Sequence, residues 1–180
     1  MTTIVDKLGR IVSKVSGDAE IIRLNTPEGC VAVADPPSAG MYYSGYAWEY
    51  IPPSPGSGFS FDYASKSWID TRTLDDVRGY KWNEIKMQRD QLEFGGFEYK
   101  GSIYDSDQVS QSRIMGAALA GIDQVWTLAD NTTVELNAAE LQQLYAALQA
   151  HIANVHERGR IARQLISDAE TKEEVEAIQL

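Results

Sequence analysis

Two histidines and one cysteine are the side chains of this sequence that could most readily bind a metal ion or act in covalent chemistry. His151 and His156 are five residues apart, which on an α-helix turns their side chains about 140° from each other, so they cannot easily share a metal. A single cysteine, Cys30, excludes an intrachain disulfide and a cysteine-based zinc site. Because it opens an apolar run after a turn, we expect it to be a small buried hydrophobic residue. We therefore predict no metal site.

Asp105 and Asp107 have the spacing of the first two ligands of a calcium-binding loop. Such a loop needs glycine at its sixth position and glutamate at its twelfth, where this chain has Ser110 and Gly116. Either aspartate is better suited to cap the helix that follows. The sequence also lacks a glycine-rich phosphate loop and a Gly-x-Ser-x-Gly nucleophile elbow. We predict no catalytic residues and no cofactor, and therefore a protein that is not an enzyme.

Negative charge is concentrated in the second half of the chain. Sixteen lysines and arginines stand against 26 aspartates and glutamates, a formal net charge of -10. Residues 1–72 carry a net charge of -2 and residues 73–180 a net charge of -8. Binding to a phosphate backbone needs a basic stripe, so we predict no nucleic-acid partner. We interpret the acidic half as solvated helix faces, with docking to a basic partner as the alternative. No apolar run in the sequence is long enough to span a membrane, so we predict no membrane insertion.

Short apolar runs separated by turn residues predict a β-rich front part. We expect strands at residues 11–15, 21–24 and 30–34, with a turn over Asn25–Gly29. Five of the six prolines then fall between residues 35 and 58, which is incompatible with a continuous central strand.

A block of aromatic side chains lies between two proline clusters, and its members are candidate partner-binding residues: Tyr42, Tyr43, Tyr46, Trp48 and Tyr50. Aromatic residues alternate within this block and again just after it, which indicates strands with one aromatic face. Two interpretations are open. The rings are either the core of a small β-domain that has few aliphatic residues, or an exposed surface for a partner or a sugar.

From Thr73 onward the apolar residues recur with a helical period. We predict helices at about 74–94, after Asp105 or Asp107, from Asn137 and from Thr171, and hairpins around Gly101 and Asp130-Asn131. The predicted fold class is α+β. A small β-rich, aromatic and proline-rich N-terminal domain (residues 1–70) precedes a mainly helical C-terminal domain (residues 71–180) that contains two short β-hairpins.

The longest predicted helix has a broad apolar stripe whose members recur at spacings of three, four and seven residues. Four of them are further candidates for partner binding: Leu141, Leu144, Leu148 and Ile152. Two small domains bury little surface on their own, so we expect contacts with a partner or a homo-oligomer.

Six segments of the back part carry a resemblance to a known family: residues 81–90, 97–101, 105–114, 126–131, 137–141 and 169–177. Through these segments, the part of the chain from about Trp68 to Ile178 resembles a domain of unknown function. That domain is found mainly in phage tail-fibre, tail-assembly and baseplate-region proteins. The front part is similar to the start of tail-fibre assembly proteins, through residues 9–12, 25–29 and 35–37.

This resemblance implies a place at a phage tail tip. The chain would be made in the host cytoplasm and, as a structural part of the virion tail, would link or decorate the tail fibre and baseplate by protein–protein contacts. Phage tail-fibre or baseplate proteins would be its partners. One alternative is a tail-fibre assembly chaperone that does not enter the virion. Another is a glycan-binding module for host recognition that uses Tyr42 to Trp48. The resemblance brings no catalytic residues.

Overall fold

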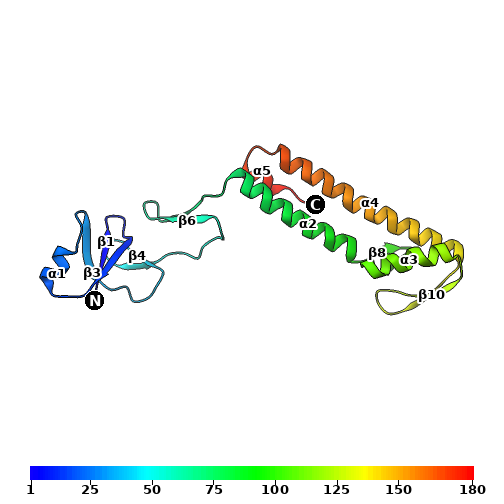
Figure 1. The fold of residues 1–180 in the computed structure, drawn as a ribbon, viewed down its shortest axis with the longest axis horizontal. Coiled ribbons are helices and arrows are strands. Elements are labelled where there is room, and N and C mark those ends of the chain that lie inside the picture. The colour runs from blue at the N-terminus through cyan, green and yellow to red at the C-terminus, as the bar shows by residue number, and fades with distance from the viewer. The chain divides into compact units, whose positions relative to one another are not determined.

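The chain folds into two compact units, Met1–Arg72 and Thr73–Leu180, called unit 1 and unit 2 below. The computed structural model describes all 180 residues. Helices make up 43% of the chain and strands 24%, and the strands are divided among five small sheets. Figure 1 shows that the long helices all belong to unit 2, in green to red.

Unit 1 is organised around a three-stranded antiparallel sheet with the strand order β2 (Ile11–Val15), β1 (Thr2–Asp6), β3 (Cys30–Ala34). Strand β1 pairs on both sides, and Thr3, Ile4 and Val5 at its centre are fully buried. Strands β2 and β3 form the two edges and are largely exposed. The strands predicted at residues 11–15 and 30–34 are confirmed.

The strand predicted at residues 21–24 is wrong, because this segment belongs to the helix α1 (Ala19–Leu24). Asp18 is the N-cap, and its carboxylate accepts hydrogen bonds from the backbone N–H groups of Glu20 and Ile21, both at 3.0 Å. A short apolar run has no clear period, so the N-cap preceding it was the better guide to its conformation.

Two hairpins complete unit 1, each a separate two-stranded sheet: β4 (Met41–Tyr43) with β5 (Trp48–Tyr50), and β6 (Phe59–Asp62) with β7 (Ser67–Asp70). Pro52, Pro53 and Pro55 lie between the hairpins. Because proline has no N–H group for a strand ladder, this segment cannot join the hairpins into one sheet.

Unit 2 contains two long helices that lie side by side, α2 (Leu74–Phe94) and α4 (Ala138–Asp168). Both begin with a capping box, in which the N-cap side chain and the side chain three residues later each bond the other's backbone N–H. The same arrangement starts the short α5 (Lys172–Ala177). The predicted helices at these positions are confirmed. None of the helices combines the length and apolar character that a membrane crossing requires.

Residues 97–136 form the end of unit 2 that we call the tip. It comprises the hairpin β8 (Phe97–Tyr99) and β9 (Ser102–Tyr104), the helix α3 (Gln108–Ala120), and the hairpin β10 (Gln124–Thr127) and β11 (Thr133–Leu136). Helix α3 packs against α4 and ends at Gly121, whose φ of 60° is left-handed. Both predicted hairpins and the intervening helix are confirmed.

Two hydrophobic clusters lie along α4. One joins the tip to the first turns of α4 and includes Phe97, Ile114 and Trp126. The other, at the far end of the helix pair, contains Val77, Ile85, Ala162, Ile166 and Val175. Unit 2 is therefore stabilised at both ends by aliphatic and aromatic burial.

The predicted fold class, α+β, is wrong, although unit 1 is β-rich and unit 2 is mainly helical, as predicted. The chain is mixed α/β, with strands spread from Thr2 to Leu136 in five small sheets and a helix, α1, already within unit 1. Most strands pair with their neighbour in the sequence through a tight turn, so no sheet grows beyond three strands. The sequence pattern located most elements but did not reveal how they divide into sheets.

Candidate functional site

Tyr42 and its neighbours form the interior of the two hairpins of unit 1. The Tyr42 ring is buried and lies 5.9 Å from the ring of Phe61, between centroids. Its hydroxyl donates a 2.7 Å hydrogen bond to Glu49, and the Lys66 ammonium lies 4.4 Å from its ring centroid. This hydrogen bond raises the pKa of Tyr42 and lowers that of Glu49. Tyr42 is therefore a core residue, which corrects its prediction as a partner-binding side chain.

Tyr43 and Trp48 are half-buried and pack edge to face, with ring centroids 5.4 Å apart. The Trp48 indole N–H donates a 3.0 Å hydrogen bond to the carbonyl oxygen of Ala34 at the end of β3. The Tyr43 backbone N–H donates to the carbonyl oxygen of Gly9 at 3.0 Å. Both residues thus attach the first hairpin to the three-stranded sheet.

Tyr46 and Tyr50 are the members of the aromatic block that face solvent, with 96% and 67% of their surface exposed. Tyr46 lies in the turn between β4 and β5, outside the strand that the alternation had predicted. The block is therefore divided, since some of its rings form the interior of unit 1 whereas Tyr46 and Tyr50 are exposed. Partner binding by these two stays a prediction.

The apolar stripe of α4 faces inward. Leu141, Leu144 and Leu148 are fully buried in the cluster beneath the tip, and Ile152 packs against the same cluster. This corrects their prediction as partner-binding residues. The two hairpins and α3 cover the stripe. The apolar surface predicted to bind another chain is therefore buried within unit 2.

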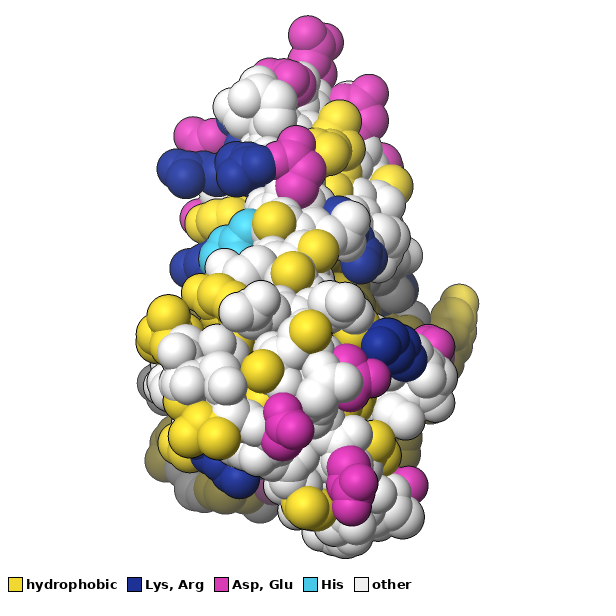
Figure 2. All heavy atoms as spheres, turned by 90° about the vertical axis from the view of Figure 1, so that its right-hand side faces the viewer, with side chains coloured by type: hydrophobic (Ala, Val, Ile, Leu, Met, Phe, Trp, Pro, Cys, Tyr) yellow, Lys and Arg dark blue, Asp and Glu magenta, His cyan; other side chains and the backbone are white.

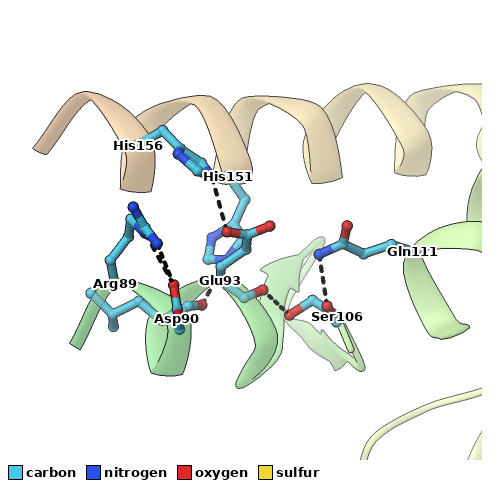
Figure 3. Close-up of polar contacts among 8 residues, drawn as sticks. Arg89, Asp90, Glu93, Ser106, Gln111, His151 and His156 are labelled. Carbon is cyan, nitrogen blue, oxygen red and sulfur yellow. Dashed lines mark hydrogen bonds and ion pairs between the residues drawn. The ribbon is translucent and has the colours of Figure 1, made fainter. Parts of the chain in front are cut away.

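A polar junction between the two clusters was not predicted from the sequence. The Nε2 atom of His156 lies 2.9 Å from a carboxylate oxygen of Glu93, and the Nε2 atom of His151 lies 2.9 Å from the carbonyl oxygen of Leu92. Figure 3 shows the two imidazoles reaching from α4 toward the last turn of α2. The His151 ring also stacks on Phe97, 5.8 Å between centroids. The histidines bind α2 to α4.

Ser106, fully buried, extends this junction toward α3. Its hydroxyl donates to the carbonyl oxygen of Glu93 at 2.6 Å and accepts from the backbone N–H of Gly96 at 2.9 Å. The Gln111 side chain donates to the carbonyl oxygen of Ser106 at 2.9 Å (Figure 3). These bonds hold the end of α2 against the start of α3. Partners this distant in the sequence leave no local pattern by which to predict them.

Asp107, and not Asp105, is the N-cap of α3. Its carboxylate accepts hydrogen bonds from the backbone N–H groups of Val109 and Ser110, and the Ser110 hydroxyl donates to it at 2.6 Å. The Ser110 hydroxyl is the largest influence lowering the pKa of Asp107. The structure contains no group of three or more potential metal-binding side chains. Cys30 is half-buried.

The outer face of α3 is apolar and exposed. Met115 and Leu119 are four residues apart, which places them along one side of the helix, and Ile122 follows just after the helix ends at Gly121. Leu119 and Ile122 expose 80% and 63% of their surface, and Val125 on β10 exposes 66%. Sequence reasoning missed this face because α3 has apolar residues on both sides and gives no clear stripe.

Two shallow grooves lie on the tip. The first, of about 360 Å³, is lined by Val125 and by acidic and polar groups that include Asp123, Glu135 and Glu140. The second, of about 390 Å³, runs between α3 and α4 and is lined by Gln108, Gln111, Ser112, Met115, Tyr145 and Gln149. Figure 2 looks onto this end of the molecule and shows hydrophobic side chains exposed between separate acidic ones.

Residues 76–179 match the family described as a domain of unknown function, DUF4376. The chain belongs to the DUF4376 family. The match covers nearly all of unit 2, from the first turn of α2 to the residues after α5, so the tip and the polar junction are parts of this DUF4376 domain. No curated protein and no solved structure matches the chain.

Proposed function

We propose that this DUF4376 protein is a structural interaction protein of a phage tail tip, which links or decorates the tail fibre and baseplate through protein–protein contacts. The exposed apolar side chains at the end of α3 and just after it are the observation that best supports a role in binding another protein. Leu119, Ile122 and Val125 would each lose contact with water on docking, which is the main favourable term in protein association.

Tyr46 and Tyr50 support the same proposal in unit 1. Tyrosines are enriched at protein interfaces because each combines a large apolar ring with a polar hydroxyl and has few rotatable bonds. Exposed rings at the first hairpin and exposed aliphatic groups at the tip give the protein a candidate contact surface in each unit. A protein that joins two others needs at least two such surfaces. The phage context itself comes from the resemblance in sequence.

Quantitative mass spectrometry of purified virions tests the proposal. We expect the chain in mature particles at a fixed ratio to the tail-fibre and baseplate proteins. A second sample, from infected cells before assembly, separates the proposal from its rival. A chain found bound to immature fibre but missing from particles would contradict a virion role and identify an assembly chaperone.

A further inference from the structure

We propose that the tip of unit 2 binds a basic amphipathic helix of a partner protein. This inference rests on the proposed function in one respect, that the protein binds a partner. It adds which surface binds and what chemistry the partner has. Two features of the tip, an apolar ridge and an excess of carboxylates, lead to it.

The ridge runs along the outer side of α3. Met115 and Leu119 lie on one side of the helix and Ile122 follows its end, while Ile114 and Ala117 on the other side of the helix are buried against α4. The ridge is therefore not required for packing within unit 2. The groove between α3 and α4 runs beside it, and Met115 lines that groove. A ridge next to a groove is the surface that another helix fits when ridges pack into grooves.

Carboxylates accompany the next exposed apolar residue along the chain, Val125. Val125 on β10 pairs directly with Glu135 on β11, so both side chains project from the same face of the hairpin. Asp123 and Glu140 line the same groove. The Glu135 carboxylate has no hydrogen-bond or ion-pair partner within the chain, so its charge is available to a cation on a partner.

Acidic side chains outnumber basic ones in the tip. Residues 97–136 contain six acidic side chains and only two basic ones. Lys100 pairs with Glu140 at 3.5 Å, and the Arg113 guanidinium lies 5.4 Å from the centroid of the Trp126 ring. A basic partner would therefore complement this excess of negative charge. A second copy of this chain does not fit, because a two-fold contact would bring like charges together. A helix with leucines on one side and lysines on the other fits both features.

A designed peptide tests this inference on the full-length chain. The probe is a Leu/Lys amphipathic helix of about 18 residues, roughly 27 Å long, and a Leu/Glu peptide of the same pattern is its comparison. Isothermal titration calorimetry gives the affinities, and NMR shift changes give the location. We expect the Leu/Lys peptide to bind and the Leu/Glu peptide not to bind. The NMR shift changes should centre on Leu119, Ile122 and Val125.

Substitutions at exposed positions then distinguish binding at the ridge from a nonspecific attraction of the cationic peptide to an acidic protein. Leu119→Ser combined with Ile122→Ser should weaken binding at least about tenfold, and Glu135→Lys about three- to tenfold with a smaller salt dependence. Matched controls lie away from the tip. Met87→Ser removes a side chain that is 62% exposed on α2, and Glu28→Lys makes the same charge change in unit 1, so neither should alter binding.

Equal binding of both peptides, or equal losses in the control variants, would overturn the inference. So would NMR shifts located away from the tip. The virion measurement is independent of this one. A chain absent from particles that still binds the basic helix at the tip would contradict the tail-tip proposal and leave the binding surface established.

Discussion

Unit 1 and unit 2 reach stability by different means. In unit 1 the fully or nearly fully buried apolar side chains are Ile4, Val5, Met41 and Tyr42, and the other seventeen in the chain belong to unit 2. Unit 1 relies instead on aromatic rings packed edge to face, on hydrogen bonds from their polar ends, and on glycine turns. Truncation of a buried aliphatic side chain should therefore lower the stability of unit 2 most. Substitution of a glycine in a tight turn should lower the stability of unit 1 most.

The largest expected effect comes from the core of unit 2. Leu144→Ala removes a fully buried side chain on α4 and should lower the free energy of unfolding of unit 2 by about 2–5 kcal/mol, through lost burial and the cavity left behind. Leu165→Ala, at a half-exposed position of the same helix, is the control and should change it by less than about 1 kcal/mol. Hydrogen exchange by mass spectrometry resolves the units. Equal losses in the two variants would mean that burial does not govern the stability of unit 2.

A glycine pair tests the backbone argument in unit 1. Gly9 and Gly29 have the same φ of +82°, but a Cβ atom at Gly9 would lie 1.9 Å from the carbonyl oxygen of Tyr43, whereas one at Gly29 would meet nothing within 4 Å. Gly9→Ala should therefore cost about 3 kcal/mol or more. Gly29→Ala should cost only the strain of a left-handed alanine, about 1–2 kcal/mol.

Chemical denaturation of both glycine variants, followed by hydrogen exchange in unit 1, measures this difference. Gly9→Ala should also expose the Tyr43 backbone N–H, which donates to Gly9. Similar costs for the two variants would show that the close approach of the chain at Gly9 is not needed for the fold.

Acid should destabilise the helix starts of unit 2. A hydrogen bond from the Thr73 hydroxyl lowers the pKa of Asp76 below its ordinary 3.8, and one from the Asn137 backbone lowers that of Glu140 below 4.5. Because the folded-state pKa values are lowered, this stabilisation is complete above about pH 4.5 and is lost as the pH falls below 4. Thermal unfolding between pH 6 and pH 3 measures the loss. Glu140→Gln should flatten the profile, and an unchanged profile would contradict the assignment.

The smallest expected effect belongs to the exposed aromatic residues of unit 1. Tyr46→Ala should change the free energy of unfolding by less than about 0.5 kcal/mol, because the ring is almost wholly in water. Tyr42→Ala, in the same block, should cost about 3 kcal/mol or more through loss of a buried ring. Thermal unfolding of the two variants compares them. A large loss in Tyr46→Ala would indicate a contact that supports the fold and would weaken its candidacy as a partner-binding residue.

The elements of unit 2 could be predicted from the sequence because their signals are local. Thr73 with Asp76 and Asn137 with Glu140 lie within one helical turn of each other, and Lys100-Gly101 form a tight turn with positive φ. In unit 1 the strands β2 and β3 were equally clear. The helix α1 was not, since six residues give too little of a period to distinguish a helix from a strand.

The candidate site was harder to predict because exposure depends on distant segments. Leu144 and Leu119 are both apolar residues on helices, yet one is fully buried and the other mostly exposed. What separates them is whether another part of the chain folds over each, and no local pattern records that. The bond between His156 and Glu93 likewise joins residues 63 positions apart.

The length of α4 fixes how far apart the two ends of unit 2 lie. At 1.5 Å per residue its 31 residues extend about 46 Å. Packing of α2 alongside, with the histidine junction partway along, braces this span against bending. Because α3 packs beside the start of α4 and α5 follows its end, these two helices lie at opposite ends of that span.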